Sequence, residues 1–348
     1  MVKVGICGLG FMGRTHFGIY LRNPKAQVVA LMDKDRRRRQ GDWAEPIGNL
    51  PASWPKKVDM GGIASYSSPD ALIADPNVEL VDITLPTDLH ADVAIQALRA
   101  GKHVLSEKPM ARTSAQCRRI VAAARRARGY YMVAQCIRFW PQYVKVKELV
   151  DSKRYGPVRS AALRRLAAPP TYSMGNWLLR HERSGGAALD LHLHDIDFAA
   201  YLFGRPRRVY ARGTKGPSGG IDHVEALWDY GKELLVAVEG GWAFAASYPF
   251  QMILTVRCAE ATLEWILRVG HGGEGFGSEV VAYQADGKIR KFAVKDATGW
   301  EAEIDYFLSC IQKRRRPAIA TATSSAESVA ICEAELKSIQ TGRPVNLR

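Results

Sequence analysis

Hydrophobic and polar positions follow two different periods along the first third of the chain. Short apolar runs typical of buried strands occur at VKVGIC, QVVALMD, VELVDITL and HVLSE. Between the last two runs, the stretch DLHADVAIQALRAG has the apolar spacing of a helix. Alternating strands and helices are typical of α/β proteins, so this region predicts a doubly wound parallel sheet.

A different pattern fills residues 206 to 295. Gly, Pro or charged turns separate strand-like segments there. These segments are RRVYARGTK, HVEALWDY, ELLVAVEGGWAF, FQMILTVRC and ATLEWIL. The second half of the chain is therefore predicted to contain a sheet built from successive strands, and no internal repeat or low-complexity linker divides it.

The stretch LDLHLHDID between these regions concentrates aspartate and histidine. A helical stripe of apolar residues runs through it, at Leu189, Leu193, Ile196, Ala200 and Phe203. In a helix Asp190 and His194 form an i,i+4 pair while His192 points elsewhere. On a strand His192 and His194 would share a face and could ligate a metal. The spacing favours the helix, so we expect no metal site.

Composition narrows the possible functions of this 348-residue chain. Its net charge of +14 comes from scattered arginine clusters without an aromatic-interleaved basic motif, so we expect anionic small ligands and no nucleic acid. The six cysteines form no CxxC pair and are expected to be reduced core thiols. The apolar start lacks the features of a signal peptide, and no run is long enough to span a membrane. We expect a cytoplasmic protein.

Three glycines follow the first predicted strand in a G-x-G-x-x-G frame. They are Gly8, Gly10 and Gly13, and they allow a tight turn, close approach of a pyrophosphate and packing of the next helix. Asp33 ends the second strand, where an acid accepts hydrogen bonds from ribose hydroxyls and disfavours a 2′-phosphate. The pattern predicts NAD binding. Lys34 and the arginines at 36 to 39 keep NADP open, and a purely structural glycine turn is the alternative.

Two further turns follow predicted strands, at Thr84 to His90 and at Glu107 to Pro109. In a doubly wound sheet, turns after parallel strands lie at the carboxyl edge, where ligands bind. We expect these turns to lie beside the nicotinamide end of the cofactor.

Several motifs resemble the glucose-fructose oxidoreductase, inositol dehydrogenase and MocA family of nicotinamide-dependent sugar oxidoreductases. They include a Glu-Lys-Pro signature at 107 to 109, a Thr-Pro-x-x-x-His loop with one extra residue between Thr84 and His90, and Arg-Phe-x-Pro at 138 to 141. The segment NWLLRHERSGGAALDLHLHDID and the closing helices are also similar. Cys136 and Arg180 depart from residues common in the family, which affects substrate contacts and leaves the reaction class unchanged.

The resemblance implies an α/β protein with a Rossmann domain over residues 1–135. A second α/β domain over residues 136–348 would contain a large, mostly antiparallel open sheet that binds substrate and forms a homodimer or homotetramer. The implied cofactor is NAD, with NADP possible. The residues expected to bind it are Gly8, Gly10, Phe11, Met12, Gly13, Asp33, Lys34, Thr84, Leu85, Pro86, Thr87, His90, Glu107, Lys108 and Arg138.

The same resemblance assigns catalysis to Lys108, Asp190 and His194. Oxidation of a secondary alcohol needs a base for the hydroxyl proton, a role that falls to His194. Lys108 would stabilise oxygen charge, and Asp190 would bind the substrate. Either packing or substrate contact is open for Tyr172, Trp177 and Tyr248. The expected substrate is a sugar, cyclitol or sugar derivative; the alternatives are an NAD-assisted glycosidase and a nucleotide-binding regulator without turnover.

Overall fold

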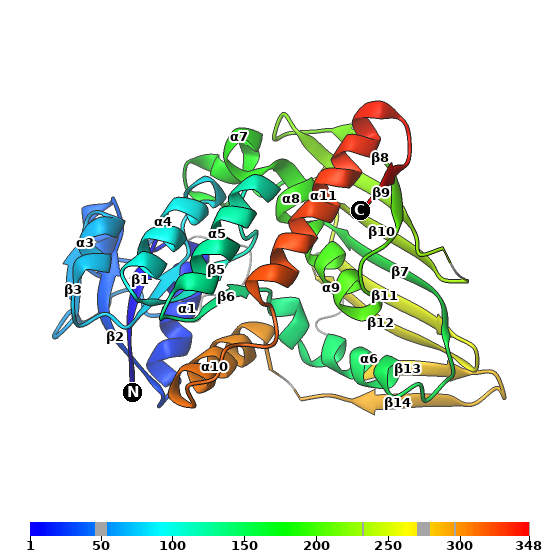
Figure 1. Ribbon diagram of the computed structural model, residues 1–348, viewed down its shortest axis with the longest axis horizontal. Helices are drawn as coiled ribbons and strands as arrows, with labels where there is room; N and C mark the ends of the chain where they lie inside the picture. Colours follow the sequence, from blue (N-terminus) through cyan, green and yellow to red (C-terminus); the bar gives the residue numbers. More distant parts are fainter. Residues whose placement is uncertain (46–53, 232, 270–278, 296, 348) are drawn as a thin grey trace. The chain divides into compact units, whose positions relative to one another are not determined.

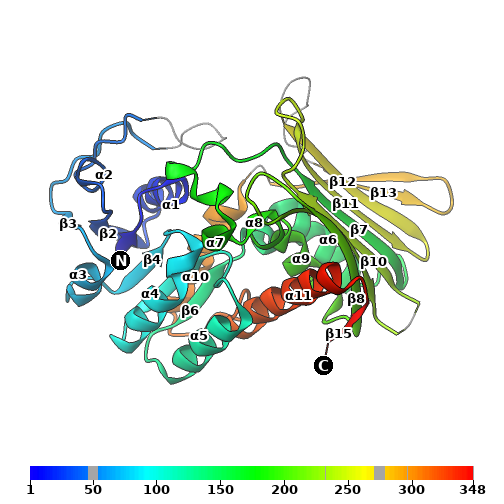
Figure 2. The same cartoon turned by 90° about the horizontal axis from the view of Figure 1, so that it is seen from above.

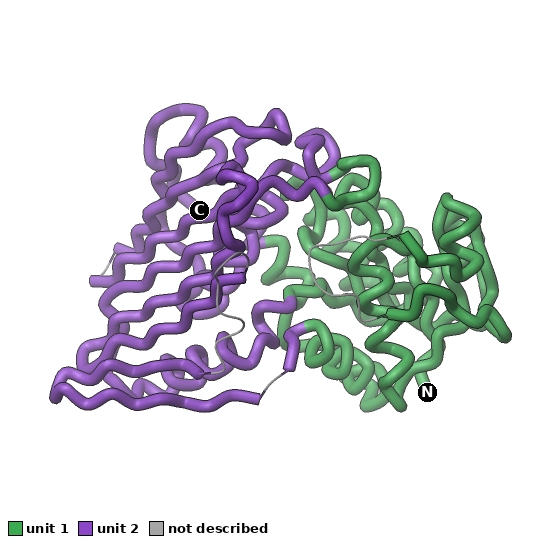
Figure 3. Tube along the Cα trace, turned by 180° about the vertical axis from the view of Figure 1, so that it is seen from behind, with its two compact units in different colours: residues 1–135, 172–177, 300–326 green, residues 136–171, 178–299, 327–348 purple. Residues whose placement is uncertain are grey.

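The computed structural model describes residues 1–45, 54–231, 233–269, 279–295 and 297–347. The chain forms two compact units, coloured separately in Figure 3. The first comprises residues 1–135, 172–177 and 300–326, and the second comprises residues 136–171, 178–299 and 327–348. The first unit thus gains two later segments that a linear division at residue 135 does not contain.

A six-stranded parallel sheet forms the centre of the first unit (Figure 1). Its order is β3-β2-β1-β4-β5-β6, as expected for a doubly wound dinucleotide-binding fold. Helices α3, α4 and α5 lie side by side on one face, and α1 lies on the other (Figure 2). The strands are β1 (Val2–Cys7), β2 (Ala26–Met32), β3 (Ala64–Tyr66), β4 (Leu80–Ile83), β5 (His103–Glu107) and β6 (Tyr131–Ala134); the helices are α1 (Phe11–Arg22), α2 (Arg36–Arg39), α3 (Pro69–Ala74), α4 (Thr87–Arg99), α5 (Ser114–Arg126) and α10 (Gly299–Gln312).

The register of this sheet brings several turns to one edge. Cys7 at the end of β1 pairs with Met32 of β2 and with Ile83 of β4, and Ile83 in turn pairs with Ser106 of β5. The strands are parallel, so their carboxyl ends meet. The residues that follow β1, β2, β4 and β5 therefore line a common edge of the first unit.

A nine-stranded sheet dominates the second unit, with the order β14-β13-β12-β11-β7-β10-β9-β8-β15. Only the β7–β10 pair is parallel, which confirms the predicted, mostly antiparallel sheet. The strands are β7 (Val158–Leu166), β8 (Arg208–Lys215), β9 (Ile221–Asp229), β10 (Leu235–Gly241), β11 (Phe250–Cys258), β12 (Ala261–Val269), β13 (Glu279–Gln284), β14 (Ile289–Ala293) and β15 (Val345–Asn346); the helices are α6 (Pro141–Asp151), α7 (His181–Ser184), α8 (Gly186–Asp190), α9 (Leu193–Phe203) and α11 (Ala322–Thr341), with 3-10 turns η1 (Cys136–Phe139) and η2 (Met174–Leu179).

Helices cover one face of the nine-stranded sheet and leave the other open (Figure 2). Along β9, Val224, Ala226 and Trp228 are buried, whereas the intervening side chains are at least partly exposed. This alternation is typical of a sheet with one face on a core. The five strand-like segments predicted from sequence correspond to β8 through β12. The sequence analysis did not identify β7, β13, β14 or β15.

The predicted single helix through 189 to 203 is interrupted. Helix α8 ends at Asp190 and α9 begins at Leu193, and the His194 N–H donates to Leu191 O at 3.3 Å. His192 sits at the break, packed so closely on Gly240 that a Cβ there would lie 2.5 Å from His192 Nδ1. The structure therefore confirms that this stretch is helical and not a strand. Leu191 and His192 keep right-handed helical backbone angles across the break, and the i,i+4 pairing of Asp190 with His194 stays a prediction.

Charged side chains are buried beneath the nine-stranded sheet. Arg165 of β7 donates from Nε to Asp195 of α9 at 2.7 Å and from Nη2 to the Tyr143 hydroxyl at 3.1 Å. Despite burial, which opposes its charge, the Asp195 carboxylate raises the pKa of Arg165. Such a pair depends on both partners, because either charge alone in the interior is strongly unfavourable.

The six cysteines are all buried thiols, in agreement with the sequence prediction. Among the described residues, no helix combines the length and the apolarity needed to cross a bilayer.

The Arg165–Asp195 pair predicts a large stability loss on truncation. Asp195→Ala should lower the free energy of unfolding by about 3–5 kcal/mol, because it leaves the buried Arg165 charge unpaired. Asp286→Ala, which removes the exposed ion pair with Lys288, is the control and should change stability little. Urea unfolding of both variants measures the difference, and equal stability of the two variants would contradict the prediction.

Candidate active site

In the glycine turn between β1 and α1, the backbone of Gly13 lies close to that of Gly8. Gly8 has φ +102°, a conformation that side chains rarely adopt. A Cβ on Gly13 would lie 1.9 Å from Gly8 O, so only glycine fits there. Two of the three predicted glycines are thus required by the fold itself.

Gly10 differs from these two glycines, because the described residues leave space beside it. Within the described part of the chain, a Cβ there would meet only the Met174 Cε, at 3.7 Å. Helix α1 begins at the next residue, Phe11, and Met12 lies in its first turn. The backbone N–H groups of a helix N-terminus attract anions. Open space at Gly10 beside this N-terminus fits the pyrophosphate of a dinucleotide.

Asp33 follows β2 at the same edge of the sheet. Its carboxylate accepts the Leu9 N–H at 2.9 Å and the Asp35 N–H at 2.8 Å, which orients both oxygens. Arg38 Nη1 lies 3.8 Å from this carboxylate, and Lys34 is exposed. The fixed carboxylate fits a ribose, whereas Arg38 is placed where it could meet a 2′-phosphate.

The turn after β4 is tied to the glycine turn. Thr84 Oγ1 donates to Gly8 O at 2.7 Å. Leu85 and Pro86 continue the turn, and α4 begins at Thr87, whose buried hydroxyl has no hydrogen-bond partner among the described residues. A buried hydroxyl without a partner at this edge is available to a ligand.

His90 links this turn to the turn after β5. Its Nε2 lies 2.7 Å from Leu85 O and its Nδ1 lies 2.8 Å from Pro109 O. Burial lowers the pKa of His90, and the two carbonyls act in the opposite direction. The ring was predicted to bind cofactor, and its observed contacts hold two candidate binding turns together.

Lys108 follows the last residue of β5. The side chain of that residue, Glu107, turns into the first unit and is 6% exposed. Glu107 Oε2 accepts the Lys108 N–H at 2.9 Å, and the Lys108–Pro109 peptide bond is cis. The lysine is half-buried and follows β5 at the edge of the sheet that also carries the glycine turn.

The other predicted catalytic residues belong to the second unit. Asp190 ends α8 with 9% exposure, and His194 lies in the first turn of α9, half-buried. His192 is fully buried and its Nε2 lies 2.9 Å from Glu335 Oε2, so it points away to α11 as expected. The roles of Lys108, Asp190 and His194 stay predictions.

The remaining predicted site residues are divided between the units. Tyr172 and Trp177 lie in the segment 172–177 of the first unit, the segment whose Met174 reaches Gly10. Tyr248 belongs to the second unit and stacks on Phe244 at 4.7 Å between ring centroids. Substrate contact by these aromatic residues stays a prediction.

Arg138, another predicted cofactor residue, lies in η1 of the second unit. Its guanidinium forms a bidentate pair with Asp197, both distances being 2.7 Å. Asp197 also accepts from the Ser328 hydroxyl at 2.7 Å. Cofactor binding by Arg138 stays a prediction.

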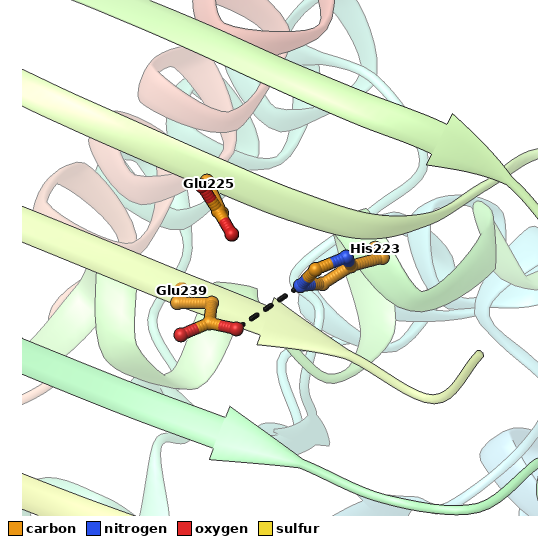
Figure 4. Close-up of side chains that lie close together, drawn as sticks. All are labelled: His223, Glu225 and Glu239. Atoms are coloured by element: carbon orange, nitrogen blue, oxygen red, sulfur yellow. Dashed lines mark hydrogen bonds and ion pairs between the residues drawn. The ribbon is translucent and has the colours of Figure 1, made fainter. Parts of the chain in front are cut away.

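One group in the described part of the chain has metal-ligand chemistry. His223 and Glu225 of β9 and Glu239 of β10 bring ligand atoms within 4.8 Å of one another (Figure 4). Glu239 already accepts from Arg164 at 2.5 Å and lies 3.1 Å from His223 Nε2. These partners, His223 first, lower the pKa of Glu239. These contacts place His223 and Glu239 in an ion-pair network with Arg164.

Sequence reasoning missed two buried polar residues near the cofactor edge, His16 and Asp82. Asp82 occupies a buried position inside an otherwise apolar strand, and His16 lies on α1. An acid within a buried strand requires a partner, and this signal was present in VELVDITL. The partner came from α1, which no local pattern identifies.

Comparison with known proteins identifies both parts of the chain. Residues 2–135 match the Gfo/Idh/MocA oxidoreductase family, NAD-binding Rossmann fold, and residues 143–264 match the C-terminal domain of the same family. In the solved structures, aldose-aldose oxidoreductase from Caulobacter crescentus has a TM-score of 0.80 at 22% identity, with 99% of each chain covered. That likeness shows the fold.

Curated relatives are similar over part of their length. Trans-1,2-dihydrobenzene-1,2-diol dehydrogenase of Xenopus laevis is 30% identical over 66% of this chain and 65% of its own. Levoglucosan dehydrogenase of Pseudarthrobacter phenanthrenivorans is 30% identical over 64% of this chain and 62% of its own. With both family models matched in order and the glycine turn built as described, the chain belongs to the Gfo/Idh/MocA family of oxidoreductases.

Proposed function

We propose that the protein is an NAD-dependent dehydrogenase or reductase that interconverts a secondary alcohol and a ketone on a sugar, cyclitol or sugar derivative. The observation that carries the proposal is the shared edge of the six-stranded sheet, where the glycine turn and Asp33 lie with the turn that bears Lys108. Curated relatives are named as diol, levoglucosan and inositol dehydrogenases, which supports this substrate class.

The proposed chemistry divides between the cofactor and the chain. Bound nicotinamide supplies hydride acceptance and donation. The first turn of α1 and Gly10 would hold the pyrophosphate, and Asp33 would hold the adenosine ribose. Lys108 would stabilise charge on the reacting oxygen, His194 would take or return the hydroxyl proton, and Asp190 would accept a hydrogen bond from the substrate.

The central test is substrate turnover. Absorbance at 340 nm should show net NADH formation with at least one alcohol in a panel of inositols, aldoses, anhydrosugars and glycosides. Cleavage of a glycoside without net NADH would indicate transient oxidation instead, and nucleotide binding without any turnover would indicate a regulator.

Replacement of the catalytic residues should lower turnover and spare cofactor binding. Lys108→Ala and His194→Ala should each lower kcat roughly a hundredfold or more, the range usual for positioned acid/base groups. The NAD affinity measured by calorimetry should change far less, because neither side chain holds the pyrophosphate.

His192→Ala is the matched control for His194→Ala. It removes the buried contact with Glu335 and should lower stability while the folded fraction keeps its kcat. EDTA should leave activity intact. Equal damage from both histidine variants together with inhibition by EDTA would replace the proton relay with a metal site.

Asp33 predicts a preference for NAD. Its carboxylate would repel a 2′-phosphate, so we expect NAD to bind at least about tenfold more tightly than NADP, given that like charges in contact cost several kcal/mol. Calorimetric titration of both cofactors tests this preference, and Asp33→Ser should reduce it. Equal or tighter NADP binding by the unmodified protein would show that Arg38 dominates.

The open face of the nine-stranded sheet supports assembly into a homodimer or homotetramer. Large apolar side chains are exposed there, with Leu227 at 50% and Ile266 at 43%. They lie on strands whose opposite sides are buried, and apolar side chains exposed on an open sheet face favour an interface with a second copy.

Light scattering at micromolar concentration should therefore detect a dimer or tetramer. Introducing charges through Leu227→Glu and Ile266→Lys should shift it toward monomer, because charges in an apolar interface are unfavourable. Leu21→Glu, at an exposed leucine of the first unit (59%), is the matched control and should not. A monomer before any substitution would reject the proposal.

A further inference from the structure

Four ionisable side chains meet inside the first unit, below the edge that carries Lys108. They come from four elements: His16 from α1, Asp82 from β4, Glu107 from β5 and Glu303 from α10. Glu107 is 6% exposed and the other three are fully buried. We call these residues the buried quartet. No role in the proposed chemistry has used His16, Asp82 or Glu303.

His16 connects two of the carboxylates. Its Nδ1 lies 2.8 Å from Asp82 Oδ2, and its Nε2 lies 3.4 Å from Glu107 Oε1. Burial opposes a charge on the imidazole, but the Asp82 carboxylate, followed by Glu107, raises the pKa of His16 well above its ordinary value. These carboxylates favour the cationic form of His16, whose Nδ1–H donates to Asp82 and whose Nε2 makes a longer ion-pair contact with Glu107.

The neutral form is favoured for Glu303, the fourth member of the quartet. Burial, reinforced by the Glu107 carboxylate, raises the pKa of Glu303 well above its ordinary value. Neither carboxyl oxygen has a hydrogen-bond partner among the described residues. Because the neutral form of Glu303 is favoured, the positive charge of His16 interacts mainly with the carboxylates of Asp82 and Glu107.

Glu107 links the quartet to Lys108. While Oε1 faces His16, Oε2 accepts the Lys108 N–H at 2.9 Å. On the other side of Lys108, Pro109 O lies 2.8 Å from His90 Nδ1. The backbone of Lys108 is therefore held by one contact on each side. The contact with Glu107 is made by the Glu107 side chain, which His16 orients.

Stability gives little reason to bury these charges. Buried ion pairs seldom improve on apolar packing, because each charge loses its hydration. Clusters of ionisable groups with displaced titration behaviour occur preferentially at functional sites. This cluster lies directly beneath a candidate catalytic lysine and reaches its backbone through one side chain.

We propose that His16 and Asp82 are positioning residues for Lys108, acting through Glu107. The inference rests on the proposed function, in which Lys108 stabilises charge on the substrate oxygen. Asp82 keeps His16 charged, charged His16 fixes the Glu107 carboxylate, and Glu107 fixes the Lys108 backbone. Loss of either upstream residue displaces the amine and leaves the glycine turn intact.

The test compares His16→Gln, Asp82→Asn and the double variant with His103→Gln. His103 lies at the opposite end of β5 from Glu107, where its Nδ1 accepts the Tyr130 N–H at 2.9 Å, so this control replaces a partly buried histidine of the same unit. The readouts are kcat and KM, NAD affinity by calorimetry, and acetylation of Lys108. The protein is acetylated with limiting acetic anhydride, and peptide mass spectrometry measures the acetylation rate of Lys108 relative to that of the exposed Lys56.

Each single variant should lower kcat roughly tenfold or more, since a displacement of about 1 Å in a reacting group can cost a hundredfold. KM and NAD affinity should stay within about threefold, and the Lys108 labelling rate should change severalfold. The double variant should be no worse than the worse single, because the residues act in series. His103→Gln should match the unmodified protein in all four measurements.

Unchanged kcat and unchanged Lys108 labelling in His16→Gln would overturn the proposal. If Asp82→Asn does not fold, the result for His16→Gln is sufficient as the test. Equal losses in NAD affinity and kcat would also overturn it, because they indicate general damage to the unit. If the unmodified protein turns over no alcohol but the variants change the Lys108 labelling rate, the result would support the positioning of Lys108 and reject the proposed function.

Discussion

The approach of Gly13 to Gly8 is the contact on which the rest of the first unit depends. A side-chain carbon at residue 13 would lie 1.9 Å from the Gly8 carbonyl, so α1 can pack this closely on β1 only because residue 13 lacks a side chain. The close packing places the N-terminus of α1 at the carboxyl edge of the sheet. It also carries His16, one turn further along, to a position opposite Asp82 of β4. One backbone contact thus sets both the candidate pyrophosphate site and the buried quartet beneath Lys108.

Buried charge is used in both units, with different consequences. In the second unit, the pairs Arg165–Asp195 and Arg138–Asp197 join helix α9 to β7 and η1 through short, bidentate contacts. Geometry of this kind satisfies both partners and specifies how helix and sheet pack. In the first unit, the quartet has one cation among three carboxyl groups, and Glu303 remains neutral because ionising it there is unfavourable. The arginine–aspartate pairs stabilise the packing of the second unit. The buried quartet is better explained by a role in positioning Lys108.

The shared edge of the parallel sheet explains why binding and catalytic functions can be separated in the proposed mechanism. Gly10 and Asp33 belong to turns that would contact the pyrophosphate and the adenosine ribose of a dinucleotide. Lys108 belongs to the turn after β5, which His90 ties to the turn after β4. Side chains that hold the cofactor therefore differ from those that would stabilise charge during the reaction. The separation allows substrate chemistry to vary within a family while the fold and the cofactor are retained.

The sequence by itself determined the elements that depend on local pattern: the glycine turn, the alternating strands and helices of the first unit, and β8 through β12 of the second. Hydrophobic period and glycine spacing are local properties, so they can be recognised along the chain. It also marked Glu107, Lys108, Asp190 and His194 as candidates by resemblance. Tertiary structure alone decided the break between Asp190 and Leu193, where His192 packs on Gly240, and the meeting of His16 with Asp82 and Glu303. Those contacts join residues far apart in the chain, and burial and charge act on them only after the chain has folded.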